Sequence, residues 1–128
     1  MSLRSPLGLV LGRGAAKDGV HHWWLQRLTS VALVLLTIWF VLALLSLPDL
    51  RYPTVTQWMS GTITALLLIL FVVTAAWHSQ LGLRVIIEDY VHARGSRTVL
   101  LMLSTFVHVF LGGAGALSVL QVLFRGAA

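Results

Sequence analysis

Asp89 and Tyr90 follow His78 by eleven and twelve positions, at the end of an apolar stretch of the chain. An imidazole can ligate a metal, and an acid beside a phenol can donate hydrogen bonds and relay protons. Eleven helical positions rise roughly 16 Å, about half of a ~30 Å hydrocarbon core, and return close to the starting direction. On a continuous helix, the spacing therefore predicts an imidazole near mid-bilayer, beneath an acid and a phenol at the water boundary.

The elements that must position these groups are membrane-spanning helices. The chain has 128 residues, of which 58% are hydrophobic and only 10% charged, outside the range of soluble globular proteins. Three apolar runs each approach or exceed the ~20 residues that a spanning helix needs: Leu28 to Leu47, Thr62 to Leu83 and Val99 to Phe124. We predict an all-α membrane protein with three transmembrane helices, in one membrane-anchor domain over residues 1–128.

Local signals give approximate bounds for these elements. Residues 1–20 are expected to form a tail, and the helices are expected at about 25–47, 58–88 and 98–124. Pro48 cannot continue a helical hydrogen-bond ladder and ends the first helix. A short external turn is predicted over Asp49 to Thr56, with Trp58 at the outer end of the second helix. Gly112, Gly113 and Gly115 are small residues of the kind that allow close helix contact in lipid.

The basic residues report topology. The net charge is +5, but the cations are not gathered into a patch interleaved with aromatics, so no nucleic-acid partner is predicted. Seven of the nine precede the first span or follow the second: Arg4, Arg13, Lys17, Arg27, Arg84, Arg94 and Arg97. The positive-inside rule then puts the N-terminus in the cytoplasm and the C-terminus in the periplasm.

Three helices alone make a thin bundle. Each helix would expose much of its circumference to lipid, so a polar group at mid-depth needs shelter from a partner subunit or a cofactor. We therefore expect the chain to form part of a larger anchor bundle. The sequence has no cysteine, so any metal must be held by histidine, by carboxylate or by a partner.

His78 is the strongest candidate for chemistry, because an ionisable group within a spanning helix marks a functional site by default. Neutral imidazole is an axial ligand of haem iron, and Gly82, one turn along, would let a flat macrocycle approach. Alternatively, His78 bonds to a neighbouring helix and Gly82 only assists packing. His108 has a similar predicted depth in the third helix, with Gly112 one turn on. The spacing does not choose between a haem bridged by His78 and His108 within one chain and a haem held by one histidine from each of two subunits.

Asp89 and Tyr90 occupy the boundary where a lipid-soluble quinone could exchange protons with water. A phenol stays a hydrogen-bond donor at neutral pH, and a carboxylate can orient a cation or relay protons. The alternative is an interfacial tyrosine anchor beside a solvated acid, the interpretation that we give to Glu88. Arg27 could pair with an anion among the helices, with His21 about two turns earlier. His22 and His92 are interpreted as ordinary interfacial residues.

Two segments resemble a known family, the small hydrophobic anchor subunit of succinate dehydrogenase, the SdhD-type chain of respiratory complex II. Gly19 to Thr29 is similar to the start of that family's first helix, with a glycine, a histidine and an arginine ahead of a threonine. The stretch from His78 through Asp89 and Tyr90 is similar to its second-helix signature. In size and three-span topology the similarity extends over nearly the whole chain, but only these two segments are specific.

The resemblance implies a membrane-anchoring cytochrome b subunit of succinate:quinone oxidoreductase. By it, His78 is an axial ligand of haem b iron, and the second anchor subunit (SdhC type) gives the other ligand. Tyr90 donates a hydrogen bond to ubiquinone, with Asp89 supporting that site, and His21 and Arg27 lie near the haem propionates. The resemblance argues against His108 as the ligand.

It also implies partners and a location. A flavoprotein subunit and an iron-sulfur subunit would dock on the cytoplasmic face, and the succinate site would lie in the flavoprotein. This chain would be a subunit of the enzyme without its catalytic domain, embedded in lipid of the bacterial inner membrane or of the mitochondrial inner membrane.

Two other classes of protein share some of these features. One is a haem-free structural anchor or assembly subunit of a respiratory complex. The other is a small multidrug transporter, which needs a membrane-embedded carboxylate to exchange protons for a cationic substrate. Every acid here lies in a tail, in a connection or at a helix end, and a fourth span is missing. The sequence therefore disfavours the transporter.

Overall fold

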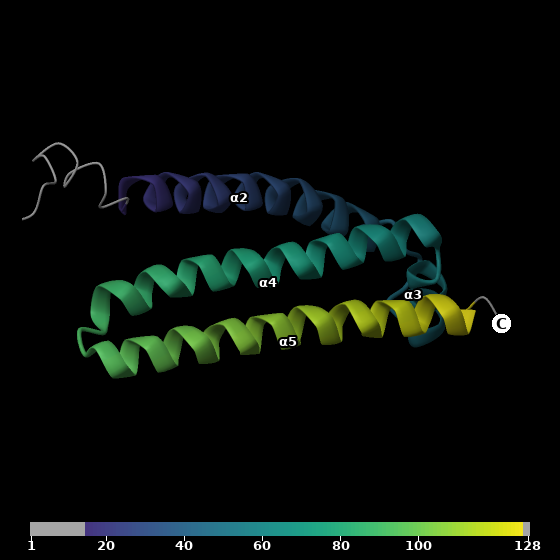
Figure 1. Ribbon diagram of the computed structural model, residues 1–128. Coiled ribbons are helices and arrows are strands. Elements are labelled where there is room, and N and C mark those ends of the chain that lie inside the picture. Colours follow the sequence, from purple (N-terminus) through teal and green to yellow (C-terminus); the bar gives the residue numbers. More distant parts are fainter. Residues whose placement is uncertain (1–14, 127–128) are drawn as a thin grey trace, which may run out of the picture.

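The computed structural model describes residues 15–126, and the description below is confined to them. Its helices are α2 (Ala15–Leu45), α3 (Tyr52–Met59), α4 (Thr62–Tyr90) and α5 (Arg94–Gly126), and this part of the chain contains no strand (Figure 1). Three helices are long and apolar enough to cross a membrane: Val20–Leu45, Thr62–Tyr90 and Arg94–Arg125. The predicted all-α architecture with three spans is confirmed.

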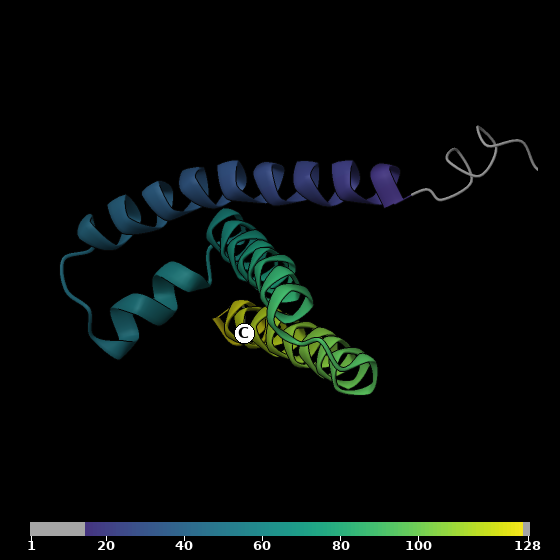
Figure 2. The ribbon, with the colours of Figure 1, turned by 90° about the vertical axis from the view of Figure 1, so that its left-hand side faces the viewer.

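The long helices are arranged with α4 in the middle. Seen along α4 and α5, these two form an antiparallel pair, whereas α2 crosses over α4 obliquely (Figure 2). In the described part of the chain α2 packs against α4 and not against α5. Any side chain of α4 that faces α2 is therefore on a different side of α4 from the α5 contact.

Two glycines set the close approach of α5 to α4. A β-carbon built on Gly115 would lie 2.6 Å from Cγ1 of Val72, and one built on Gly112 would lie 3.3 Å from Cβ of Ala76. A β-carbon on Gly113 would have no atom within 4 Å. Gly112 and Gly115 therefore serve helix contact, as the sequence predicted, while Gly113 faces open space.

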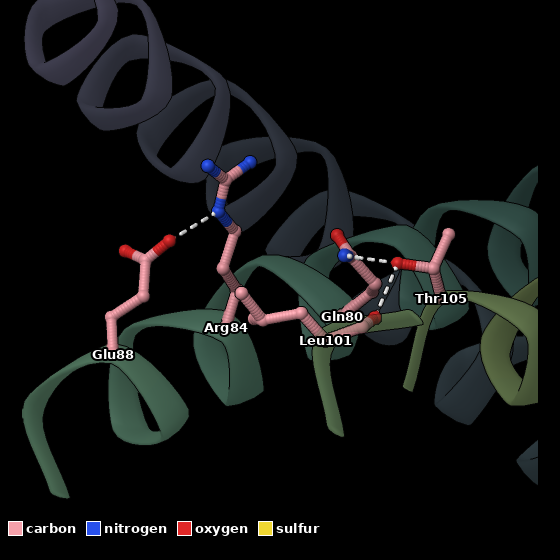
Figure 3. A network of polar contacts seen from close by, with 5 residues as sticks. All are labelled: Gln80, Arg84, Glu88, Leu101 and Thr105. Carbon is pink, nitrogen blue, oxygen red and sulfur yellow. Dashed lines mark hydrogen bonds and ion pairs between the residues drawn. The ribbon is translucent and has the colours of Figure 1, made fainter. Parts of the chain in front are cut away.

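A polar contact joins α4 to α5 nearer the connection between these two helices than the glycine contacts. The Gln80 amide donates a hydrogen bond to Oγ1 of Thr105 at 3.3 Å, and the Thr105 hydroxyl donates to the Leu101 carbonyl at 2.9 Å (Figure 3). One turn further along α4, Nε of Arg84 lies 2.8 Å from Oε1 of Glu88. This exposed ion pair contributes about 0.3–0.5 kcal/mol. It therefore stabilises the end of α4 locally and adds little to the stability of the fold.

The connection between the first two spans differs from the prediction. Residues Tyr52–Met59 form the short helix α3 where a turn was expected, and α4 begins at Thr62 rather than at Trp58. Pro53 lies in the first turn of α3, a position where proline favours helix initiation, and the chain bends again at Gly61. The other long helices also begin earlier than predicted, at Ala15 and Arg94, while residues 1–14 of the expected tail lie outside the described part.

Trp58 consequently anchors α3 to the spans instead of capping the second one. Its indole stacks on Trp39 of α2 with ring centroids 6.2 Å apart, and Phe40 stacks on Phe71 of α4 at 5.3 Å. Of these rings, Trp39, Phe40 and Trp58 pack against a small core of Ala65, Leu68 and Val119. Each such ring pair is worth about 0.5–1.5 kcal/mol beyond its buried area, so the cluster fixes one end of the bundle.

A local contact organises the chain just before α3. The Thr54 side chain and the Arg51 backbone N–H donate hydrogen bonds that lower the pKa of Asp49 from its usual value. Since the pKa of Asp49 is depressed, the carboxylate favours this conformation above its ordinary pKa. That contribution fades as the pH falls through the lowered value.

Candidate functional site

His78 lies on the side of α4 that faces α2. Its Nδ1 is 2.9 Å from Oγ1 of Thr29, a residue that is only 6% exposed. Its Nε2 has one polar neighbour, Nε2 of Gln26, at 3.5 Å, the outer limit of a hydrogen bond. One ring nitrogen is thus well paired, and the other is nearly free.

Two buried polar atoms on the α2 face that contacts this imidazole have no hydrogen-bond partner within the described chain. They are Nε2 of His22 and Oε1 of Gln26. His22, Gln26 and Thr29 are spaced by four and then three positions, so they share one face of α2. Buried polar atoms are almost always paired in folded proteins, and unpaired ones point to a missing ion, water or group.

Gly82 adds to the same site from α4. It lies one turn from His78, and a β-carbon built on it would be 3.8 Å from Nε2 of Gln26. The absent side chain therefore leaves the Gln26 side of the site uncrowded. An imidazole nitrogen with only one long contact, two unpaired polar atoms on α2 and a glycine one turn from His78 would suit a bound prosthetic group, with His78 as its candidate ligand.

His108 has a different environment. Its Nδ1 donates a hydrogen bond to the Ser104 carbonyl at 2.7 Å, and its Nε2 lies 3.1 Å from Oγ of Ser79. It lines a cleft of about 450 Å³ between α4 and α5, next to Trp77, Gln80, Gly112 and Gly113. Both nitrogens are therefore occupied, and the structure does not bring His108 together with His78, whose partners are on α2.

Asp89 and Tyr90 close the last turn of α4, which runs without interruption from His78 to Tyr90. The helical spacing of the sequence argument therefore applies, and these residues lie roughly 16 Å along the axis from His78. Both side chains are exposed, Tyr90 to 80%, and neither has a hydrogen-bond partner within residues 15–126. They are free to meet a ligand or a partner subunit.

The structure places both α2 residues that were predicted to lie near an anion at exposed positions. His21 is exposed, and the Arg27 guanidinium, also exposed, lies 5.4 Å from the centroid of the Trp23 ring. The histidine with a buried, unpaired nitrogen is instead its neighbour His22. Sequence reasoning set His22 aside as interfacial and overlooked Gln26 and Thr29. The available signal was their helical spacing, which does not say which face meets α4.

In residues 15–126, no group of three or more His, Cys, Asp or Glu side chains could hold a metal ion.

Three helices long and apolar enough to span a membrane, with a partly open histidine between two of them, indicate an integral membrane protein. The family described as the succinate dehydrogenase/fumarate reductase transmembrane subunit matches residues 1–112. This chain therefore belongs to that family.

Named relatives agree on an anchor of the SdhD type. The succinate dehydrogenase hydrophobic membrane anchor subunit of Rickettsia bellii is 34% identical over 89 residues, which cover 70% of this chain and 71% of that one. Its counterpart in Rickettsia felis is 30% identical over 112 residues, or 88% and 91% of the two chains. The succinate dehydrogenase membrane anchor subunit of Reclinomonas americana is 30% identical over 113 residues, or 85% and 87%.

Proposed function

We propose that this chain anchors succinate:quinone oxidoreductase in the membrane, contributes His78 to haem b and forms part of the ubiquinone-reduction site. The observation that carries the haem assignment is the nearly free Nε2 of His78, together with two unpaired buried atoms on the α2 face that contacts His78. Bound haem b supplies one-electron redox chemistry. The chain's own part is to present the imidazole, to exclude water from it and to fix its orientation through α2.

Membership of the family supports the remaining partners. An SdhC-type anchor subunit gives the second iron ligand, and the iron-sulfur and flavoprotein subunits lie on the cytoplasmic side. The excess of Lys and Arg around the N-terminus and between the last two spans supports that orientation. The organisms of the relatives point to a bacterial or mitochondrial inner membrane.

For the quinone site, Tyr90 is the proposed donor to a carbonyl oxygen of ubiquinone, and Asp89 supports the proton route. Their exposure at the end of α4 and their lack of partners in the described chain favour this role. Because quinone reduction consumes protons, a donor at the water boundary shortens the path that they travel.

Purification of the assembled complex in mild detergent tests the assignment. We expect a flavoprotein, an iron-sulfur protein and a second small hydrophobic chain to copurify with a b-type absorption. Copurification of the partners without that absorption would leave a haem-free anchor and refute the haem assignment. Isolation of the chain without these partners would refute the whole assignment.

Tyr90→Phe is expected to lower succinate-to-quinone turnover about tenfold, the effect of losing roughly one hydrogen bond in the transition state. Succinate oxidation measured with a soluble dye should stay near the wild-type rate. Tyr52→Phe is the matched control, because Tyr52 is equally exposed but lies on α3, at the other end of the bundle. Equal losses with quinone and dye would mean failed assembly and would remove the case for Tyr90.

A further inference from the structure

Thr29 is one of two buried polar side chains in the described part of the chain, the other being Ser104. Its hydroxyl oxygen lies 2.8 Å from the Leu25 carbonyl and 3.1 Å from the Gln26 carbonyl of its own helix. A hydroxyl has a single proton, and carbonyl oxygens only accept hydrogen bonds. Two oxygens at these distances repel each other unless a proton lies between them, so we take the Thr29 hydroxyl to donate to its own backbone.

This leaves the Thr29 oxygen as an acceptor toward α4. Its contact with Nδ1 of His78, at 2.9 Å, then requires the proton to be on Nδ1. A neutral imidazole has one proton, so Nε2 of His78 carries a lone pair. The orientation of the Gln26 side chain agrees, since its amide nitrogen, a donor, faces Nε2 at 3.5 Å and its oxygen is left unpaired.

From these contacts we propose that Thr29 is a positioning residue, which holds His78 in the Nδ1–H tautomer and so keeps Nε2 available as a ligand. A histidine side chain in water favours the opposite tautomer, with the proton on Nε2. Ligating histidines commonly donate their second N–H to a fixed acceptor, which sets the ring orientation and raises ligand basicity. The value of the tautomer for iron rests on the proposed function, whereas the tautomer itself follows from the contacts.

His108 gives an internal comparison. Its Nδ1 also carries the proton, because it donates to the Ser104 carbonyl at 2.7 Å. Its Nε2, however, accepts from the Ser79 hydroxyl at 3.1 Å. The two intramembrane histidines therefore have the same tautomer but differ in what meets Nε2, and only His78 depends on Thr29.

The tautomer can be measured directly on the full chain in detergent micelles, without haem. With ¹⁵N-labelled histidine, long-range ¹H–¹⁵N spectra distinguish a protonated Nδ1 from a protonated Nε2. We expect a protonated Nδ1 at His78 in the wild-type chain and in Thr29→Ser, which keeps the hydroxyl. In Thr29→Val the Nε2–H form should become the major one, while the His108 signals stay unchanged.

Thr37→Val is the matched control. It makes the same substitution on α2, two turns further along, at an exposed position. In the assembled complex, Thr29→Val should also weaken haem binding by about tenfold and shift the haem midpoint potential, and Thr29→Ser should restore both. A mere packing role would be satisfied by valine, which has nearly the same shape, and would leave the tautomer and the potential unmoved.

The outcomes separate this inference from the proposed function. If His78 keeps its proton on Nδ1 in Thr29→Val, Thr29 does not set the tautomer and the inference is overturned, whatever binds haem. If the tautomer switches as expected but the haem survives removal of the His78 ring, the tautomer role stands while His78 loses its place as the iron ligand.

Discussion

His78→Leu is expected to abolish the b-type absorption of the purified complex while leaving its subunits assembled. The variant removes the only ring nitrogen on α4 that the structure leaves open toward α2. If His78 holds the haem iron, as proposed, its removal would take away a bond that retains the haem, so most of the absorption should be lost rather than a modest fraction of it.

The fold should survive this change. The Thr29 hydroxyl keeps its own hydrogen bond to the Leu25 carbonyl, and the only donor on α2 that loses an acceptor is the Gln26 amide, whose contact with His78 is long at 3.5 Å. Leucine also fills an apolar helix interface at small cost. Copurification of the partner subunits, together with the visible spectrum of the same sample, therefore separates loss of haem from loss of assembly.

His108→Leu is the matched control for this experiment. Its nitrogens already have partners in Ser104 and Ser79, so the b-type absorption should stay intact. The freed Ser79 hydroxyl can turn to a carbonyl of its own helix. An intact spectrum in His78→Leu with a lost spectrum in His108→Leu would reverse the ligand assignment.

Gly115→Ala is expected to destabilise the contact between α4 and α5 by about 1–3 kcal/mol, a typical cost of overpacking. The added β-carbon would lie 2.6 Å from Cγ1 of Val72. Valine in a helix has one strongly preferred rotamer and cannot easily swing away, so the helices themselves must separate. A lower thermal midpoint and a lower yield of assembled complex would report this separation.

Gly113→Ala makes the same change two positions away, where a β-carbon would meet nothing within 4 Å. Alanine is the better helix former by about 1 kcal/mol, so this variant should match or slightly exceed the wild-type stability. Both variants add one methyl group to the same helix, and their difference therefore isolates the contact with Val72. Equal stabilities would show that α5 does not approach α4 as closely as the structure describes.

Much of this protein follows from composition and periodicity alone. The lengths of the apolar runs predict three spans. The eleven residues from His78 to Asp89 form continuous helix in α4, so the rise calculated from the sequence applies. The small residues Gly112 and Gly115 were correctly expected at a helix contact. The short helix α3 does not follow from the sequence, because Pro53 suits a turn as well as the first turn of a helix.

The contacts around His78 were decided by the tertiary structure. The sequence places His22, Gln26 and Thr29 on one face of a helix and His21 on another, but every face of a membrane helix is largely apolar. With lipid as apolar as the helix surface, the rotation of α2 about its axis is set by packing against α4. Only that rotation turns Thr29 toward His78 and leaves Arg27 outside, which is why residue types identified the imidazole and packing alone identified its partners.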